Sequence, residues 1–532
     1  MHRLFFCFFI VPVLVCAQSQ QHWVDSIYAN MSLDQKIGQL FMVMAFPDGN
    51  DAKQQHTIYQ LKKYQVGGLL FSKGTSNQQL QDTKRYQQLS EIPLMIAADA
   101  EWGMAMRLQD IEPYPYAMTL GALPNTDLIY ALAKRLGDRK RLMGVHVSFA
   151  PVADINTESK NPIIGVRAYG DNPNRVAQQA QAFMEGLQDA GIWSVAKHFP
   201  GHGASKLDSH RQLPTINRAK QALDTIDLFP FRHLFLKGIK GVMVGHLDVP
   251  ALDNSALPVS VSSKVVTQLL QNELGFDGLV FTDALDMKGV TTSVKSPALA
   301  AFLAGADVLV MPLDIEKAIL NIKQSYYNGE ISPKRLEHSV KKILQAKYIF
   351  SSHHRSKNQM IQKPLQNTYY DAYLRNQIAI QSIVKVHATQ NQFPLSLSTN
   401  VNYVALGVPS SNVFLDALND HTQTTEIPTH KIQVVEISAR PIVVGVFANT
   451  ASPWNCQSIS VADKALLSDL SSYSNVHIVI FANPYVCAQI PNLSSFASVI
   501  LAHEQQPEFA NAAAKVLFGR IPAMGILPVH IK

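Results

Sequence analysis

The sequence is poor in cysteine and in charged side chains. Only 4 of its 532 residues are cysteine, and Asp, Glu, Lys and Arg together make up 16%. Cys7 and Cys16 lie in an apolar N-terminal run, which leaves Cys456 and Cys487 for the rest of the chain. In an oxidising compartment these two cysteines can form at most one disulfide, and two separate buried thiols are an equal alternative.

The chain also lacks patterns that are typical of other protein classes. Its net charge is +6, but no block of Lys or Arg occurs, so we expect no nucleic-acid-binding surface. We find no Gly-rich phosphate loop, no metal-ligand spacing, no short repeat and no later run that reads as a membrane span. Hydrophobic residues make up 47% of the chain, which predicts a globular protein, and 532 residues are too many for one core.

The first 17 residues have the layout of a secretory signal peptide. The charged pair His2-Arg3 precedes the apolar run Leu4–Val15, and Cys16-Ala17 supplies small residues before a polar stretch. The run is short for a membrane span. We therefore expect an exported protein, in the periplasm or outside the cell. Lipid anchoring through Cys16 is the alternative, but the bulky residue before that cysteine fits it poorly.

From about residue 30 to 350, short apolar runs alternate with segments of helical length. The runs show no in/out alternation, which is typical of parallel strands covered on both faces. Helices are expected between them, for example at 174–191 and 263–274. Repeated strand–helix units over ~300 residues predict a (β/α)8 barrel of the TIM type, with a doubly wound open sheet as the alternative. The expected strands are 67–71, 94–98, 147–150, 194–196, 242–244, 279–281 and 308–310.

Polar side chains follow several of these strands directly, which favours the barrel. They are Asp99, Lys197, His198, His246 and Asp283. In a barrel the carboxyl ends of the strands meet at one mouth, where such enzymes gather their chemistry. Packing alone does not explain so many polar strand ends, so we expect these residues to converge.

A second α/β domain is expected after a polar linker. Apolar strands are predicted at 403–406, 442–446, 476–480 and 498–501, with helices at 462–470 and 507–518. This pattern indicates a sheet with helices on both sides. The predicted organisation is a signal peptide at 1–17, a barrel domain at 18–350, a linker at 351–368 and a smaller α/β/α sandwich domain at 369–532.

The segment 197–203, Lys-His-Phe-Pro-Gly-His-Gly, places a cation and two imidazoles where a buried strand enters a loop. Such groups are costly at a sharp bend unless something polar is bound there. Asp208 and His210 follow, and in an extended segment residues two apart point the same way. A carboxylate beside an imidazole fixes its tautomer and raises its pKa, as a general acid/base requires. A surface hydrogen bond is the simpler interpretation of such a pair taken alone.

Asp283 ends another apolar strand, in the segment Phe281-Thr282-Asp283-Ala284-Leu285-Asp286-Met287. A carboxylate at the end of a barrel strand can attack an anomeric carbon and form a covalent glycosyl intermediate. Asp286 lies past the strand end, where capping of a helix N-terminus is the plainer role. Asp283 is therefore the expected nucleophile.

Together these motifs resemble the β-N-acetylglucosaminidase branch of glycoside hydrolase family 3, represented by bacterial peptidoglycan-recycling enzymes. The most specific element is Lys-His-Phe-Pro-Gly-His-Gly at 197–203, followed by Asp-Ser-His at 208–210 and Thr-Asp-Ala-Leu-x-Met at 282–287. The similarity covers nearly the whole chain after the N-terminal run. Further matching segments are 99–103 with 107–108, 149–154, 161–167, 517–522 and 525–529.

The resemblance implies a role for each matching residue. Asp283 would be the nucleophile of a retaining enzyme, His210 the general acid/base and Asp208 its partner. A His–Asp pair thus replaces the second carboxylate that most glycosidases use. Neither a metal nor an organic cofactor is implied. The substrate would be a terminal β-linked N-acetylglucosamine on a peptidoglycan fragment, a chitin oligomer or a glycan. Its hydroxyls would be bound by Asp99, Arg107, Arg167, Lys197 and His198.

The sequence departs from the family pattern at two places. Trp102 stands where the family usually has a second Gly, and this change reshapes the wall near Asp99 and could offer a sugar a stacking face. Ala204-Ser205 stands where the family usually has Asp-Thr, in the loop that carries His210, and bears on the closing motion of that loop. Neither change removes a residue with an implied chemical role.

Three other functions are compatible with the same motifs. A β-glucosidase of the family would usually take its acid/base from the second domain as a Glu, which would leave Asp208 and His210 without a role. Phosphorolysis is the second, because a neutral imidazole repels incoming phosphate less than a carboxylate does. A catalytically silent sugar-binding protein would lack the nucleophile or the acid/base, and both are present. The sequence sets no oligomeric state.

Overall fold

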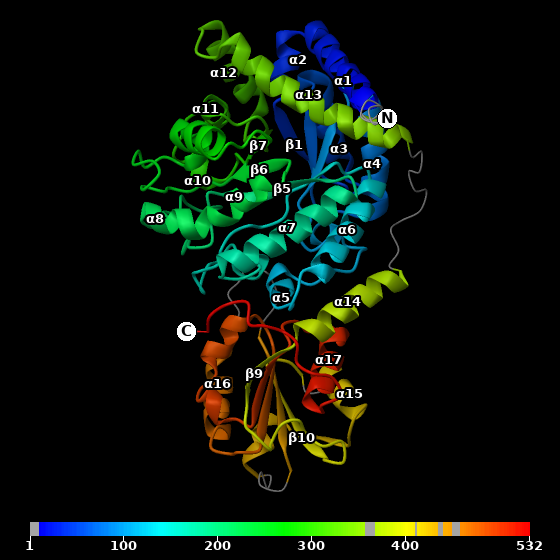
Figure 1. Cartoon of the computed structure of the whole chain (residues 1–532), viewed down its shortest axis with the longest axis vertical. Helices are drawn as coiled ribbons and strands as arrows, with labels where there is room; N and C mark the ends of the chain where they lie inside the picture. The colour runs from blue at the N-terminus through cyan, green and yellow to red at the C-terminus, as the bar shows by residue number, and fades with distance from the viewer. Residues whose placement is uncertain (1–9, 357–367, 410–411, 435–439, 449–457, 532) are drawn as a thin grey trace, which may run out of the picture.

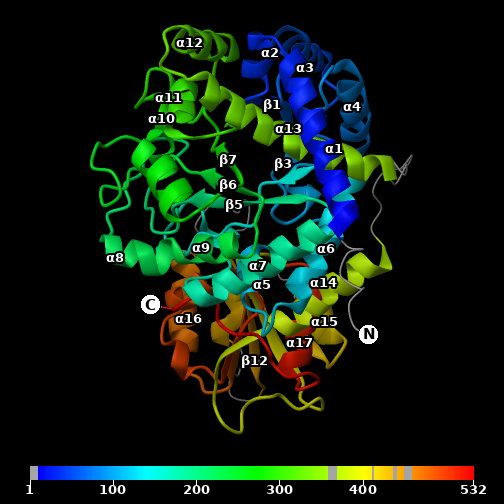
Figure 2. The same ribbon diagram turned by 45° about the horizontal axis from the view of Figure 1, so that its top comes forward.

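The computed structural model describes residues 10–356, 368–409, 412–434, 440–448 and 458–531. It contains two parts, each built around one sheet: an eight-stranded sheet, followed along the chain by a six-stranded one. In Figure 1 the first part occupies the upper half and the second part the lower half. Figure 2, in which the upper part is turned forward, shows helices on all sides of the first sheet.

The first sheet is a barrel of eight parallel strands. The strand order is β7-β6-β5-β4-β3-β2-β1-β8, and a bridge between Phe281 and Val308 joins β7 to β8. The predicted (β/α)8 barrel is confirmed, and the open-sheet alternative is wrong. The strands are β1 (Phe41–Ala45), β2 (Gly68–Phe71), β3 (Met95–Ala98), β4 (Val147–Ser148), β5 (Trp193–Phe199), β6 (Gly241–Val244), β7 (Leu279–Thr282) and β8 (Leu309–Val310).

The helices around the barrel follow from ordinary start signals and apolar faces. In α7 (Pro173–Asp189) the Asn172 side chain accepts from Arg175 N at 3.1 Å, and proline occupies the first turn. Its buried residues recur every three or four positions and face the barrel. The other barrel helices include α3 (Asp51–Tyr64), α4 (Ser76–Leu89), α5 (Ala117–Gly121), α6 (Asp127–Leu142), α9 (Phe229–Leu236), α10 (Lys288–Thr291), α11 (Pro297–Ala304), α12 (Ile315–Tyr327) and α13 (Pro333–Ser356). The helix expected at 263–274 is a π-helix, Lys264–Glu273.

The second part is a sheet covered on both faces, as predicted. Its order is β11-β10-β12-β13-β14-β9, and β9 runs antiparallel to β14. Alternate residues of β10 enter different cores: Val404 and Leu406 pack on one face, Tyr403 and Ala405 on the other. Its strands are β9 (Val384–Ala388), β10 (Val401–Leu406), β11 (Thr424–Glu426), β12 (Ile442–Phe447), β13 (Val476–Phe481) and β14 (Ser498–Leu501). Its helices are α14 (Tyr369–Ser382), α15 (Val413–Asn419), α16 (Val461–Leu470) and α17 (Pro507–Leu517).

Several sequence predictions fall wholly or partly outside the described residues. The predicted signal peptide begins there, and the first described helix, α1, is Ile10–Asn30. No helix among the described residues is long and apolar enough to cross a membrane. The first residues of the predicted linker are helical, because α13 continues to Ser356. Cys487 is a free thiol whose pKa burial raises to about 12, and Cys456 lies outside the described residues.

Two buried acids of the second part hold the segment that follows β3. Asp371, in the first turn of α14, accepts from Arg135 Nε at 2.8 Å and also from Tyr114 Oη. Glu504, beyond β14, accepts from Tyr116 N at 2.8 Å and from Thr119 Oγ1 at 2.6 Å. The second part therefore contacts the same segment that begins with Asp99.

Candidate active site

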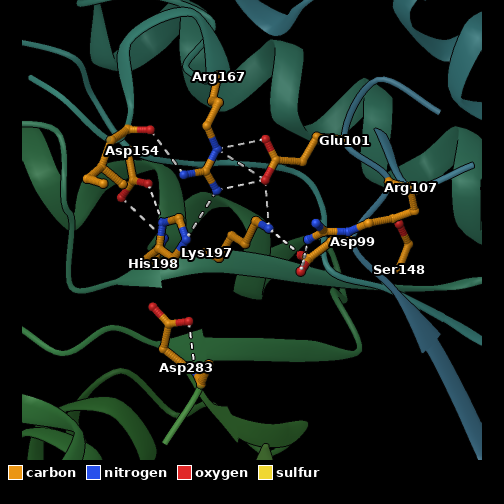
Figure 3. Close-up of polar contacts among 12 residues, drawn as sticks. Asp99, Glu101, Arg107, Ser148, Asp154, Arg167, Lys197, His198 and Asp283 are labelled. Carbon is orange, nitrogen blue, oxygen red and sulfur yellow. Dashed lines mark hydrogen bonds and ion pairs between the residues drawn. The ribbon is translucent and has the colours of Figure 1, made fainter. Parts of the chain in front are cut away.

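The polar residues that follow the barrel strands lie together at the carboxyl ends of those strands (Figure 3). Asp99 follows β3, Lys197 and His198 lie near the end of β5, and Asp283 follows β7. Arg107 and Arg167 reach the same cluster from the loops after β3 and β4. Because parallel strands end at one rim, residues almost 200 positions apart become neighbours.

Asp99 is held between two cations. Lys197 Nζ donates to its Oδ1 at 2.8 Å, and Arg107 Nη2 donates to its Oδ2 at 2.8 Å. Burial alone would raise the pKa of Asp99, but Lys197 and Arg107 hold it well below its ordinary value. The carboxylate therefore stays charged at neutral pH, and its position is fixed before any ligand arrives.

Glu101 forms the other half of this cluster, although no role was predicted for it from the sequence. Arg167 grips it with two bonds, Nε to Oε2 at 2.9 Å and Nη2 to Oε1 at 2.7 Å, and Lys197 Nζ lies 2.7 Å from Oε1. Burial raises the pKa of Glu101, but the charges of Arg167 and Lys197 outweigh it and bring the pKa to about 2. The sequence could have indicated Glu101 only by its position, two residues after Asp99 and next to a strand end.

Asp154 orients His198 and was likewise not assigned a role from the sequence. Its Oδ2 lies 2.7 Å from His198 Nδ1, and its Oδ1 accepts from the backbone N of His198 at 3.1 Å and of His202 at 2.7 Å. The Asp154 side chain is fully buried, which raises its pKa. The interactions with His198 and His202 together have the larger opposite effect, so the pKa of Asp154 lies below its ordinary value. Asp154 thus fixes the His198 proton on Nδ1 and leaves Nε2, 3.5 Å from Arg167 Nη2, as an acceptor.

Asp283 stands slightly apart from this cluster, with its carboxylate pointing toward His198 (Figure 3). Its Oδ1 accepts from Ala284 N at 2.8 Å. Burial would raise the pKa of Asp283, but His198 and His246 lower it below the ordinary value. An ionised carboxylate with few hydrogen bonds is suited to act as a nucleophile.

Asp208 and His210 form a pair, although not in the way the sequence suggested. His210 Nδ1 lies 3.0 Å from Asp208 Oδ1, and His210 N donates to the same oxygen at 2.8 Å. The segment is a turn, since Arg211 N donates to Asp208 O at 3.0 Å, so the prediction of an extended segment is wrong. The His210 side chain is 60% exposed. Its charge is one of the smaller contributions that lower the pKa of Asp283, after those of His198 and His246.

Two smaller predictions are also wrong. Trp102 is only 9% exposed, and its ring packs against Tyr116 with centroids 5.0 Å apart, so it offers no stacking face to a sugar. Asp286 does not cap a helix, because α10 begins at Lys288 and its N-cap is Met287, without a side-chain bond. In the loop that departs from the family pattern, Ser205 Oγ donates to Leu207 O at 2.7 Å.

The arrangement combines three chemical elements. An ionised carboxylate, Asp283, lies beside a cluster of fixed charges that can bind hydroxyl groups. A His–Asp pair in the loop after β5 can give and take a proton. Within the described residues, no group of three or more His, Cys, Asp or Glu is placed to hold a metal ion.

Comparison with known proteins places the barrel in one family. Residues 32–346 match the family model described as the glycosyl hydrolase family 3 N-terminal domain. Beta-hexosaminidase A of Pseudoalteromonas piscicida is 31% identical over 323 residues, 54% of this chain and 54% of that protein. A beta-hexosaminidase of Nitrosomonas eutropha is 36% identical over 293 residues, 52% of this chain and 83% of that protein.

The similarity to a solved structure extends over both parts of the chain. A glycoside hydrolase family 3 beta-N-acetylglucosaminidase from a Paenibacillus species aligns with a TM-score of 0.79 and 27% identity, over 94% of this chain and 99% of that one. The sequence match to the Pseudoalteromonas protein, in contrast, spans only about half of its length, 54%. Because the family model matches more than half of the 532 residues, from 32 to 346, the chain belongs to glycosyl hydrolase family 3.

Proposed function

We propose that this chain is a retaining exo-β-N-acetylhexosaminidase that releases terminal β-linked N-acetylglucosamine. The observation that carries the proposal is the Asp208–His210 pair, with Nδ1 and Oδ1 3.0 Å apart, in a barrel whose strand β7 ends next to the buried carboxylate of Asp283. The names of the two beta-hexosaminidases and of the Paenibacillus enzyme support the same activity. The aglycone would be a peptidoglycan fragment, a chitin oligomer or a glycan.

The reaction would proceed in two steps. Asp283 attacks the anomeric carbon while His210 Nε2–H gives its proton to the glycosidic oxygen, so that the aglycone leaves as an alcohol and a glycosyl–Asp283 ester remains. In the second step the neutral imidazole takes a proton from water, which attacks the same carbon and releases Asp283. Asp208 stabilises the imidazolium and keeps its Nδ1 proton in place without transferring it.

The fixed charges would bind the sugar. Asp99 stays ionised between Lys197 and Arg107, so it accepts from substrate hydroxyls with both partners already in position. Arg167 and His198 present a donor and an acceptor side by side, 3.5 Å apart. Such forked groups suit neighbouring hydroxyls, and their prior order lowers the entropic cost of binding.

A pair of chromogenic substrates tests the proposal. The aryl β-N-acetylglucosaminide should be cleaved with a much higher kcat/KM than the aryl β-glucoside, with retention at the anomeric carbon. Adding phosphate should not divert the product to a sugar phosphate. Faster cleavage of the glucoside, a phosphorylated product, or no turnover of either substrate would each contradict it.

We further propose that the protein is exported after removal of its N-terminal segment. The charged, apolar and small-residue layout of residues 1–17 supports this route. Its test is the N-terminus of the protein recovered from the producing cells.

A further inference from the structure

One imidazole of the site has no role in the proposed reaction. His202 lies in the loop after β5, is 1% exposed, and its ring centroid is 5.8 Å from that of His198. Its Nε2 lies 3.0 Å from Ser209 Oγ. Ser209 is the residue between Asp208 and His210, so the ring contacts the turn that carries the acid/base.

We propose that His202 is a positioning residue, which holds the proton-transferring His210 in place by anchoring Ser209. The inference rests on the proposed function of His210 as general acid/base. It predicts that the distance between His210 and Asp283 depends on the hydrogen bond between His202 and Ser209, although neither residue contacts the substrate.

The protonation state of His202 suits an anchor rather than an acid. Burial lowers its pKa to about 4, with a further contribution from His198, so the ring is neutral at neutral pH. Its Nδ1 has no hydrogen-bond partner among the described residues. An unpaired acceptor is less costly in the interior than an unpaired N–H, so the proton is expected on Nε2. Nε2–H then donates to Ser209 Oγ.

Ser209 is held from a second side by the segment that carries the nucleophile. Its carbonyl oxygen accepts from Gly289 N at 3.1 Å, six positions after Asp283. A Cβ on Gly289 would lie 2.9 Å from that oxygen, closer than such atoms approach, so the contact requires glycine. Ser209 itself is 1% exposed. The buried Ser209 is thus bonded both to His202, just after β5, and to Gly289, after β7.

His210 gains no comparable support from its own ring. Its side chain is 60% exposed, and its Nδ1 bonds to Asp208, which is in the same turn. The Asp208–His210 bond fixes the ring relative to the turn, and it does not fix the turn relative to Asp283. The two hydrogen bonds of Ser209 fix the turn relative to Asp283, because they join it to His202 after β5 and to Gly289 after β7.

The test compares substrates that need the proton with substrates that do not. Ser209→Ala removes the Oγ anchor. We expect kcat/KM for a disaccharide or alkyl N-acetylglucosaminide to fall about five- to tenfold, the effect of losing one buried hydrogen bond at the proton-transfer geometry. For a dinitrophenyl N-acetylglucosaminide, whose phenol leaves without help, kcat/KM should change by less than about twofold.

Further variants guard against a mere folding defect. His202→Gln keeps an N–H donor near the position of Nε2 and should restore most of the lost activity relative to His202→Phe. Gly289→Ala, which pushes on the Ser209 carbonyl, should show the same selective loss on poor leaving groups as Ser209→Ala.

The chain offers a matched control far from the site. Ser498 Oγ lies 2.9 Å from His477 Nδ1 in the second part, and both residues are buried. Burial lowers the pKa of His477 to about 4, as for His202. Ser498→Ala therefore breaks the same kind of bond and should affect both substrates equally.

The outcomes separate this inference from the proposed function. Suppose that His210→Ala shows a selective loss of kcat/KM on poor leaving groups. An equal loss of kcat/KM on both substrates in Ser209→Ala, or no loss on either, would then overturn the anchor and leave the acid/base assignment intact. If His210→Ala shows no selectivity between leaving groups, the acid/base assignment fails first, and the anchor fails with it.

Discussion

Replacing Asp154 by Asn should reverse the hydrogen-bonding role of His198 in the site. Asp154 Oδ2 accepts from His198 Nδ1–H at 2.7 Å, which leaves His198 Nε2 as an acceptor facing Arg167 Nη2 at 3.5 Å. Asparagine has nearly the same volume, and its oxygen can still accept the two backbone N–H bonds. Its amide, however, offers N–H to Nδ1, so the imidazole proton must move to Nε2. A donor then faces the Arg167 guanidinium.

The size of the effect follows from the bonds that change. The sugar loses one acceptor, and two donors are left facing each other in a buried site, a cost of about 1.5–3 kcal/mol. This corresponds to a fall in kcat/KM of about 10- to 150-fold. Because His198 is proposed to bind the sugar and not the leaving group, the fall should be similar across aryl N-acetylglucosaminides whose phenols differ in acidity. Circular dichroism would check that the fold is retained.

Asp307→Asn provides the control for this experiment. Asp307 is also a fully buried carboxylate of the barrel, paired with Lys342 Nζ at 2.8 Å, but it precedes β8 and so lies at the opposite end of the strands. Its loss should lower the melting temperature and leave kcat/KM within about twofold of the wild type. If Asp154→Asn keeps the wild-type kcat/KM, the claim that Asp154 sets the tautomer of His198 for substrate binding is wrong. A loss that grows as the phenol becomes less acidic would instead place His198 in proton transfer.

Other consequences of the structure are open to measurement. Burial raises the pKa of Glu504 from 4.5 to about 7, so the native state keeps a proton that the unfolded chain releases, and stability should fall by up to about 3 kcal/mol as pH rises from 4.5 to 7. Thermal unfolding of Glu504→Gln should lack this dependence, and an unchanged pH profile would contradict the assignment. Asp371→Ala leaves Arg139, 3% exposed, without this partner and should cost about 3–5 kcal/mol, seen as a lower melting temperature in calorimetry. An unchanged melting temperature would show that the contact between the two parts is not held by this acid. Mass spectrometry of exported protein should find an N-terminus near Gln18, whereas an intact Met1 on cytoplasmic protein would argue against export.

The barrel could be predicted because its strands have two independent features in the sequence. Each is a short apolar run without alternation, and several end in a polar residue, as at Asp99 and Asp283. β1 (Phe41–Ala45) was not predicted, because it follows α2 (Leu33–Gly38) almost directly and an apolar run beside a helix is ambiguous. The short strand β11 and the antiparallel edge strand β9, with mixed burial, were missed for lack of an apolar run.

The site was predictable where chemistry depends on residue type, and not where it depends on contacts. Asp283 and the Asp208–His210 pair stand out by position and spacing. The roles of Glu101 and Asp154 depend on ion pairs with residues 66 and 44 positions away, which no local pattern reveals. Whether Trp102 offers a sugar a stacking face could not be read from the sequence, because tertiary packing buries its ring against Tyr116.

Asp283 is expected to form a covalent glycosyl intermediate, and trapping that intermediate is the decisive experiment. An activated fluorosugar of the N-acetylglucosamine series should inactivate the enzyme with a 1:1 stoichiometry, and peptide mapping should find the sugar on the peptide that contains Asp283. Asp283→Asn should neither be labelled nor turn over substrate. A label on a peptide without Asp283, or near-wild-type turnover by Asp283→Asn, would show that another group is the nucleophile.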